Sequence, residues 1–159
     1  MDRSAAAAVP LPAGRTELAT AWIAYGAATL GLVFGWPALV AVLIAYARRR
    51  DAVGTPFASH YAWLIRSFWG ALGLALVCAA IVMAGAWPVM REAATLASEA
   101  RGQFDVDLVL GMDWQALLPQ AATMAAGGLG LLAVYVWLAY RLVRGALRLA
   151  SMAPAPEAA

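Results

Sequence analysis

Few residues in this 159-residue chain have side chains able to carry out chemistry. There is one histidine, His60, and one cysteine, Cys78, and no carboxylate falls inside a long apolar run. A catalytic triad or a closed zinc site needs more partners than this, so the sequence does not favour enzymatic activity or a bound metal. His60 alone could serve as an axial haem ligand, but a histidine bonded to lipid or backbone at the membrane surface is the simpler interpretation. We therefore expect no cofactor.

The charged side chain that dominates the sequence is arginine, which supplies all eleven basic residues. The guanidinium group matches phosphate oxygens and keeps its charge near lipid, although a GC-rich coding bias would give the same composition. Near an anionic membrane surface each arginine contributes about 1 kcal/mol of attraction. The candidate lipid- or partner-binding residues are His60, Trp63, Arg66, Arg48, Arg49, Arg50, Arg141, Arg144 and Arg148.

Composition places these residues in a membrane protein. Apolar residues make up 64% and charged residues 13% of the chain, whereas soluble domains have about 45–50% and about 25%. Uncharged runs of thirty, twenty-four and twenty-seven residues follow Glu17, Arg66 and Asp113. A helix of about twenty apolar residues crosses the hydrocarbon core. The sequence therefore predicts an all-α, polytopic integral membrane protein with three transmembrane helices, at about 18–47, 67–89 and 117–140.

The segments outside these runs are short. We expect disordered tails at 1–15 and 151–159 around a membrane domain at 16–150, and an acidic, solvated loop at 91–115. Within this loop, residues 104–108 alternate like a strand. Asp105 and Asp107 lack the further oxygen ligands, the central glycine and the terminal glutamate of a calcium-binding EF-hand. A metal site is therefore not expected there.

The first run contains Gly35-Trp36-Pro37 past its middle. Proline removes a backbone donor and keeps the residue before it out of the α region. The run could therefore be one tilted helix with a kink near Trp36, or a re-entrant hairpin that turns at Pro37. The second arm of such a hairpin, about eleven residues, is too short to cross the membrane alone. We favour the single kinked helix over 18–47.

A polar stretch separates the first two runs and leads into the second. Gly54 breaks the chain, Thr55 can serve as an N-cap, and Pro56 suits the first position of a helix. Residues 56–66 then place apolar and polar side chains on different faces. We predict an interfacial amphipathic helix at 56–66, which lies at the membrane surface before the second transmembrane helix begins.

This interfacial segment holds three residues suited to a docking surface. Arg66 would reach phosphate at the headgroup level, and Trp63 prefers the same interface. His60 belongs to the residue type whose charge ordinarily changes near neutral pH. A surface helix with a purely structural role is the alternative.

Small residues recur four apart in every run, and such stripes let helix backbones approach closely in lipid. Together they favour a packed bundle, although alanine and glycine are abundant throughout the chain. The stripes are Gly31 and Gly35 in the first run, Ala71, Ala75 and Ala79 in the second, and Ala122, Ala126 and Gly130 in the third.

The distribution of arginine predicts an orientation. If the stretch around Arg48 and the C-terminus share one side of the membrane, that side holds seven arginines and two acids, and the opposite side holds four arginines and seven acids. Arginine-rich segments stay in the cytoplasm. We therefore expect the N-terminus outside and the C-terminus in the cytoplasm, as three crossings require.

Two segments of the sequence resemble a known family. The first contains Ile44-Ala45-Tyr46, a short basic cluster, Asp51-Ala52-x-Gly54-Thr55 and Ser59-His60-x-x-Trp63-x-Ile65-Arg66-Ser67-Phe68-Trp69. The second is Val136-Trp137-x-x-Tyr140-Arg141-x-x-Arg144-Gly145. Together they resemble a family of small bacterial inner-membrane proteins of unknown function, which is distantly similar to a component of the chloroplast inner-envelope import translocon. The resemblance implies a helical membrane fold, a bacterial inner-membrane location and an assembly or translocation role. It marks His60, Trp63 and Arg66 as the residues of interest.

Two functions fit these expectations. The first is a small structural or accessory inner-membrane protein whose basic cytoplasmic face engages anionic lipid or a membrane-protein partner. The second is a subunit of an oligomeric membrane conduit or translocation channel, but the helices offer only small polar groups such as Thr29 and Thr123 to line a water path. The expected partners are membrane lipids and a membrane protein or a second copy of the chain, and no nucleic acid.

Overall fold

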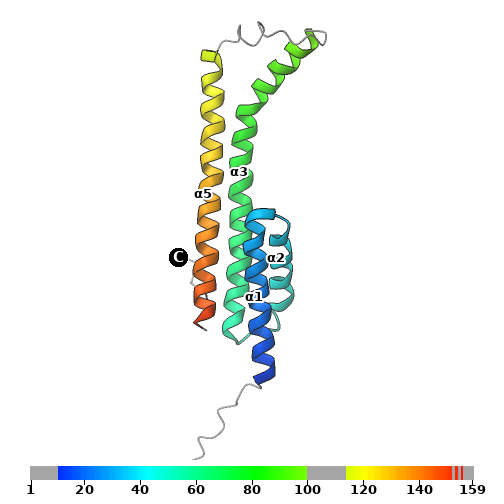
Figure 1. Ribbon diagram of the computed structural model, residues 1–159, viewed down its shortest axis with the longest axis vertical. Helices are drawn as coiled ribbons and strands as arrows, with labels where there is room; N and C mark the ends of the chain where they lie inside the picture. The colour runs from blue at the N-terminus through cyan, green and yellow to red at the C-terminus, as the bar shows by residue number, and fades with distance from the viewer. Residues whose placement is uncertain (1–10, 100–113, 152, 154, 156–159) are drawn as a thin grey trace, which may run out of the picture. The chain divides into compact units, whose positions relative to one another are not determined.

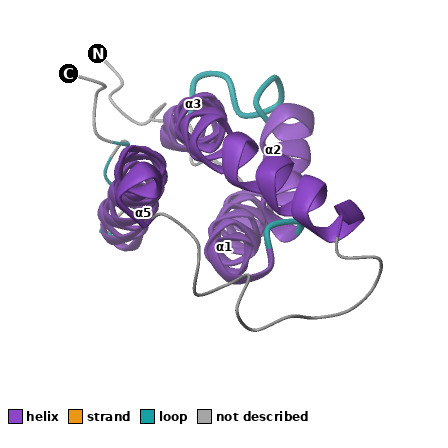
Figure 2. Cartoon of the chain, turned by 90° about the horizontal axis from the view of Figure 1, so that it is seen from above, coloured by secondary structure: helices purple, strands orange, loops and turns teal. Residues whose placement is uncertain are grey.

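In the computed structural model the described residues are 11–99, 114–151, 153 and 155, and all regular structure within them is helical (Figure 2). The helices are α1 (Leu11–Phe34), α2 (Pro37–Arg48), α3 (Pro56–Glu99) and α5 (Trp114–Ala150) (Figure 1). Three stretches are long and apolar enough to cross a membrane: Arg15–Phe34, Pro56–Thr95 and Leu117–Ala150. The predicted all-α, polytopic membrane fold is confirmed.

Some predictions fall outside the described residues. These are the tail up to residue 10, the part of the acidic loop at 100–113, with its strand-like alternation and the aspartates Asp105 and Asp107, and residues 152, 154 and 156–159 of the second tail. The remainder of the first tail and of the acidic loop is helical, because α1 already begins at Leu11 and α3 continues through residues 91–99.

The first apolar run forms two helices instead of one. α1 ends at Phe34, Gly35 takes a left-handed conformation with φ 73°, and its N–H donates to the carbonyl of Gly31 at 2.9 Å. α2 starts at Pro37, where a missing backbone donor costs nothing. Glycine after one helix and proline at the start of the next form a stop and a restart. The prediction of one kinked helix over 18–47 is therefore wrong, and the chain turns back as a hairpin.

α1 and α2 pack side by side as the two arms of this hairpin (Figure 1). Near the turn, a Cβ added to Gly31 would lie 2.5 Å from the Cβ of Ala38. At the other end, Nη2 of Arg48 forms an ion pair with Oε1 of Glu17 at 2.7 Å. The start of α1 and the end of α2 therefore lie together. The predicted orientation instead separated Glu17 and Arg48 by the length of one helix through the membrane.

α3 begins at Pro56, as predicted, after the chain turns at Gly54 with φ 84°. Thr55 precedes it, and its hydroxyl donates to the carbonyl of Ala52 at 2.7 Å. The helix then runs unbroken for 44 residues. Residues 56–66 are therefore the first turns of α3 and form no helix of their own.

The chain divides into two compact units, and α3 and α5 contribute to both. Unit 1 comprises residues 1–71 and 135–159, and unit 2 comprises residues 72–134. A buried hydrophobic cluster lies in unit 1. Its members are Ala21, Ala24, Tyr25, Ala45, Ala52, Tyr61, Leu64, Ile65, Leu142 and Leu149.

Unit 2 brings two helical segments together through small residues. A Cβ added to Gly127 would lie 2.9 Å from the carbonyl oxygen of Cys78, and one added to Gly130 would lie 2.7 Å from Sγ of Cys78. Gly130 therefore occupies a close helix contact, as its stripe predicted. The other members of that stripe, Ala122 and Ala126, are exposed, so the stripe as a whole is not the contact face.

The glycine stripe of the first run is also confirmed only in part. Gly31 lies at the close contact between α1 and α2. Gly35 instead forms the turn between these helices, where its positive φ favours glycine.

Candidate functional site

His60 lies in the interior of unit 1, with 1% of its surface exposed. Its Nδ1 is 3.0 Å from the hydroxyl oxygen of Tyr25 in α1, and its Nε2 is 2.9 Å from the carbonyl oxygen of Ala153. A carbonyl can only accept, so Nε2 carries a proton and donates it to Ala153. In the neutral ring Nδ1 is then the acceptor, and the Tyr25 hydroxyl donates to it. His60 therefore connects α1, α3 and the segment after α5.

Both ring nitrogens of His60 are thus engaged within the chain. Coordination of a haem iron would break one of these two bonds, so the geometry does not favour the axial-ligand interpretation. Among the described residues, no group of three or more histidine, cysteine, aspartate and glutamate side chains is arranged to hold a metal ion. The His60 ring is buried within unit 1 and does not face lipid, and its bond to the Ala153 carbonyl agrees with the prediction of a histidine bonded to backbone.

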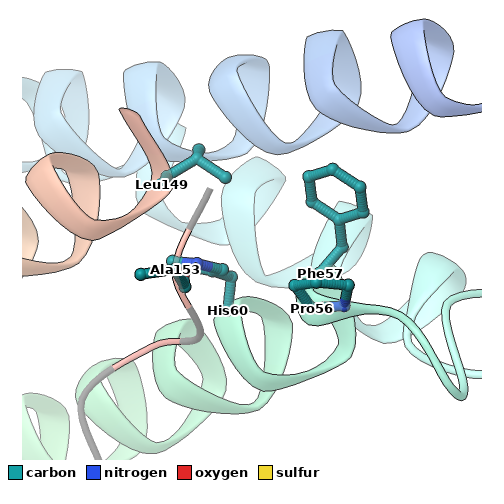
Figure 3. Close-up of a pocket in the computed structure, with 5 residues that line it drawn as sticks. All are labelled: Pro56, Phe57, His60, Leu149 and Ala153. Carbon is teal, nitrogen blue, oxygen red and sulfur yellow. Dashed lines mark hydrogen bonds between the residues drawn. The ribbon is translucent and has the colours of Figure 1, made fainter. Parts of the chain in front are cut away.

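The segment after α5 packs on the first turns of α3. The N–H of Ala155 donates to the hydroxyl of Ser59 at 3.0 Å, and the Ala153 carbonyl accepts from His60. These contacts contradict the prediction that all of 151–159 is a disordered tail. A pocket of about 130 Å³ lies beside the segment. It is lined by Pro56, Phe57, His60, Leu149 and Ala153 (Figure 3).

A second cluster in unit 1 is centred on Arg141 of α5. Its guanidinium carbon lies 3.8 Å from the ring centroid of Trp63 and 4.9 Å from that of Trp137. Nε of Arg141 donates to the hydroxyl of Ser67 at 3.0 Å. Nη2 is buried and has no hydrogen-bond partner among the described residues. We call Arg141, Trp63, Trp137 and Ser67 the arginine cluster.

Helical spacing explains how this cluster forms. Trp63 and Ser67 are four residues apart on α3, and Trp137 and Arg141 are four apart on α5, so each pair shares one helix face. The indole N–H of Trp63 donates to the backbone carbonyl of Arg141 at 3.3 Å, which fixes one helix against the other. Arg66 is next to Ser67, is exposed, and interacts electrostatically with Arg141. Trp63 itself is only 7% exposed, contrary to the predicted surface position.

Arg48, at the end of α2, is held by two carboxylates. It pairs with Glu17 at 2.7 Å and with Asp51 at 3.7 Å. The hydroxyl of Tyr61 also donates to Glu17, at 3.5 Å. The predicted role of Arg48 in binding lipid or a partner is therefore not supported, since its charge is neutralised within the chain.

The other predicted arginines outside the cluster are exposed and form no ion pair with any described residue. Glu17 and Asp51 are the only carboxylates in the described part of unit 1, and both pair with Arg48. The charges of these arginines are therefore not neutralised by described residues. We call them the exposed arginines: Arg49, Arg50, Arg66, Arg144 and Arg148.

Sequence reasoning missed several partners of the predicted residues. Ser67 and Trp137 could have been found, because each lies four residues along a helix from a predicted residue. Ser67 follows Trp63, and Trp137 precedes Arg141. Tyr25 had no such signal. It lies 35 residues before His60, and only the packing of α1 against α3 brings the two side chains together.

The two segments that carry the family resemblance meet in unit 1, where Trp63 and Ser67 of the first contact Arg141 of the second. Gly145 of the second also lies against the ring and hydroxyl of Tyr25. Comparison of the chain with protein-family models, with curated proteins and with solved structures finds no match.

Proposed function

We propose that this chain is a small structural or accessory protein of the bacterial inner membrane, whose exposed arginines engage the anionic lipid surface or an acidic membrane-protein partner. The observation that supports this best is the charge of unit 1. Both described carboxylates of unit 1 pair with Arg48, so no described acid of unit 1 neutralises the exposed arginines. Anionic headgroups attract such charges by about 1 kcal/mol for each arginine near the surface.

The same charges support an orientation. Of the described arginines, only Arg91 belongs to unit 2, and all others belong to unit 1. Arginine-rich flanking segments stay on the cytoplasmic side. We therefore assign the end of unit 1 that carries Arg48 to the cytoplasm. The ion pair of Arg48 with Glu17 takes the start of α1 to the same side, and the bond of His60 with Ala153 takes the C-terminal segment there as well.

Two properties of the hairpin support its entering and leaving the membrane on one side. α2 has 12 residues, which span about 18 Å, less than the hydrocarbon core of about 30 Å. The side chains around the turn are apolar and exposed: Val33 by 73%, Phe34 by 64% and Trp36 by 68%. Lipid would cover them without cost, whereas water would not.

The alternative, a subunit of an oligomeric conduit, would need polar groups that face a water path. The hydroxyl of Thr29 instead donates to the carbonyl of Tyr25 at 2.9 Å, and that of Thr123 donates to the carbonyl of Pro119 at 2.8 Å. Both groups are satisfied within their own helices. These contacts favour the accessory function.

Lipid composition around the protein tests the proposal. The protein is extracted with its lipid into polymer-bounded discs from membranes of phosphatidylglycerol and phosphatidylcholine, and the lipids in the discs are quantified. We expect enrichment of phosphatidylglycerol around the wild type. The triple variant Arg49→Gln, Arg50→Gln, Arg148→Gln should lose most of it at low salt, because three charges are removed.

Arg91→Gln is the control, since it removes an exposed charge from unit 2 and should leave the enrichment unchanged. Purification in mild detergent tests the proposed membrane-protein partner. A partner that depends on the exposed arginines should copurify with the wild type and be lost from the triple variant. Unchanged lipid enrichment in the triple variant, together with no partner that depends on these arginines, would overturn the proposed function.

A further inference from the structure

One nitrogen in the arginine cluster lacks a partner. Nη2 of Arg141 is the only buried side-chain nitrogen or oxygen among the described residues for which no hydrogen bond is found. Buried donors are ordinarily bonded, because leaving one unpaired costs the free energy of its lost hydration. Nη2 has no acceptor among the described residues, so the Arg141 guanidinium keeps hydrogen-bonding capacity that these residues do not use.

The acceptor that fits this position is anionic. No described carboxylate lies in the cluster, since Glu17 and Asp51 are committed to Arg48. Arg66 is adjacent in sequence to Ser67, which contacts Arg141, and its charge is also positive and repels that of Arg141. Two neighbouring guanidinium groups without a counter-ion favour an anion that can accept hydrogen bonds from both.

The shape of the cluster favours phosphate. The guanidinium carbon of Arg141 lies 3.8 Å from the ring centroid of Trp63 and 4.9 Å from that of Trp137. The Nε of Arg141 is held by its hydrogen bond to Ser67. The guanidinium is planar, and these contacts fix the direction of its remaining N–H groups, which form the fork that pairs with phosphate oxygens.

The position of the cluster favours a lipid as the source of that phosphate. Arg66 directly precedes the uncharged run of α3, and Arg141 directly follows that of α5. Tryptophan and arginine at the ends of transmembrane runs lie at the level of the headgroups. A phospholipid presents its phosphate at this level.

We propose that Arg141 and Arg66 bind the phosphate group of one phospholipid. This inference rests on the proposed function, but it narrows a diffuse attraction to one site of defined chemistry. Because Ser67 and the two tryptophans hold the Arg141 guanidinium in place, one lipid molecule should stay bound while the surrounding lipids are lost.

Native mass spectrometry of the full-length protein in mild detergent tests this site. The probes are phosphatidylglycerol, a diacylglycerol with the same acyl chains but no phosphate, and inorganic phosphate. We expect one equivalent of phosphatidylglycerol to bind about tenfold more tightly than diacylglycerol, since only the former offers charge-assisted hydrogen bonds. Inorganic phosphate that binds as tightly as phosphatidylglycerol would identify free phosphate as the ligand and overturn the lipid assignment.

Two variants test the residues. Arg66→Gln alters an exposed side chain and leaves the helix contacts intact, and Arg141→Lys keeps a positive charge but loses the planar fork. Each should weaken phosphatidylglycerol binding about tenfold. Arg91→Gln, which removes a charge from unit 2, should bind like the wild type. Wild-type binding by both Arg66→Gln and Arg141→Lys would disprove the site, as would a protein partner that is lost in these variants while lipid binding is unchanged.

The two proposals fail in different ways. The discs could be enriched in phosphatidylglycerol while the protein in detergent retains no single equivalent of it. This result would support the proposed function and overturn the Arg141 site. One retained equivalent that depends on Arg66, without enrichment that depends on the other exposed arginines, would support the site and overturn the diffuse attraction.

Discussion

Units 1 and 2 are built on the same two helices, α3 and α5, but their side chains are used differently. In unit 1, polar side chains bond from one element to another, as Tyr25 does with His60 and Arg141 with Ser67. In unit 2, the hydroxyls of Thr95, Ser98 and Thr123 donate to carbonyls of their own helices. Polar bonds between different elements are therefore a feature of unit 1, where the proposed lipid contacts lie.

Burial shows the same difference. Tyr25, His60 and Tyr61 are almost fully buried in unit 1. In unit 2, Leu76, Val77 and Leu129 are each at least 60% exposed, and its helices meet at glycines. Apolar outer faces and small residues at the contact are what helices in lipid use to associate.

The strongest test of this comparison asks on which side of the membrane each end of unit 1 lies. In a Cys78→Ala background, Ser4→Cys and Ser151→Cys should react with an impermeant thiol reagent only from the cytoplasmic side, and Ser98→Cys only from outside. The reason is that the Glu17–Arg48 ion pair holds the start of α1 at the end of α2, and the His60–Ala153 bond holds the segment after α5 at the start of α3. The effect should be all or none, and reaction of Ser4→Cys and Ser151→Cys from opposite sides would exclude this topology.

Local helix signals explain how much of the fold could be predicted. The uncharged runs indicated apolar helices but not their bounds, since α3 and α5 extend well beyond 67–89 and 117–140. Gly54 and Pro56 correctly placed the start of α3. The hairpin at Pro37 was considered and set aside because its second arm is too short to cross the membrane alone, whereas the left-handed Gly35 after α1 and Pro37 at the start of α2 form the turn. Glycine after the last helical residue was a readable stop signal.

The candidate site was less predictable, because its contacts depend on packing between helices. The sequence correctly marked Arg66 as exposed and indicated His60, Trp63 and Arg141 as residues of interest. It could not show that His60 is buried, since the partners Tyr25 and Ala153 lie 35 and 93 residues away. A buried histidine and a surface histidine have the same sequence pattern on an amphipathic helix.

The largest stability effect should come from Gly145. A Cβ at this position would overlap the hydroxyl and ring of Tyr25, so Gly145→Ala should displace Tyr25 from His60. We expect a loss of about 3 kcal/mol, from overpacking and a weakened buried hydrogen bond. Thermal unfolding in detergent, followed by circular dichroism, measures it.

Gly128→Ala on the same helix is the matched control. A Cβ there meets nothing within 4 Å, so stability should be unchanged or rise by about 0.5–1 kcal/mol. Equal unfolding temperatures for the two variants would show that α5 does not pack against Tyr25 in this way.

A smaller loss is expected when the His60 network is removed without adding volume. His60→Leu leaves the Tyr25 hydroxyl and the Ala153 carbonyl without their partner, which should cost about 2 kcal/mol. Adding Tyr25→Phe removes one of these unpaired groups and should restore part of the loss. If the double variant is less stable by the full sum of the two single changes, the two side chains are not coupled.

The smallest effect should come from the ion pair that closes the hairpin. Both side chains are partly exposed, at 34% for Arg48 and 21% for Glu17, and such pairs contribute about 0.5–1 kcal/mol. Glu17→Gln should therefore lower stability only slightly, because Arg48 keeps Asp51 at 3.7 Å. It should also free most of the Arg48 charge, so discs formed with this variant should hold more phosphatidylglycerol than those of the wild type. Asp51→Asn removes the longer contact and should change both quantities less. A large loss of stability with no gain of anionic lipid would mean that Glu17 serves the fold of unit 1 alone and has no bearing on its charge toward the membrane.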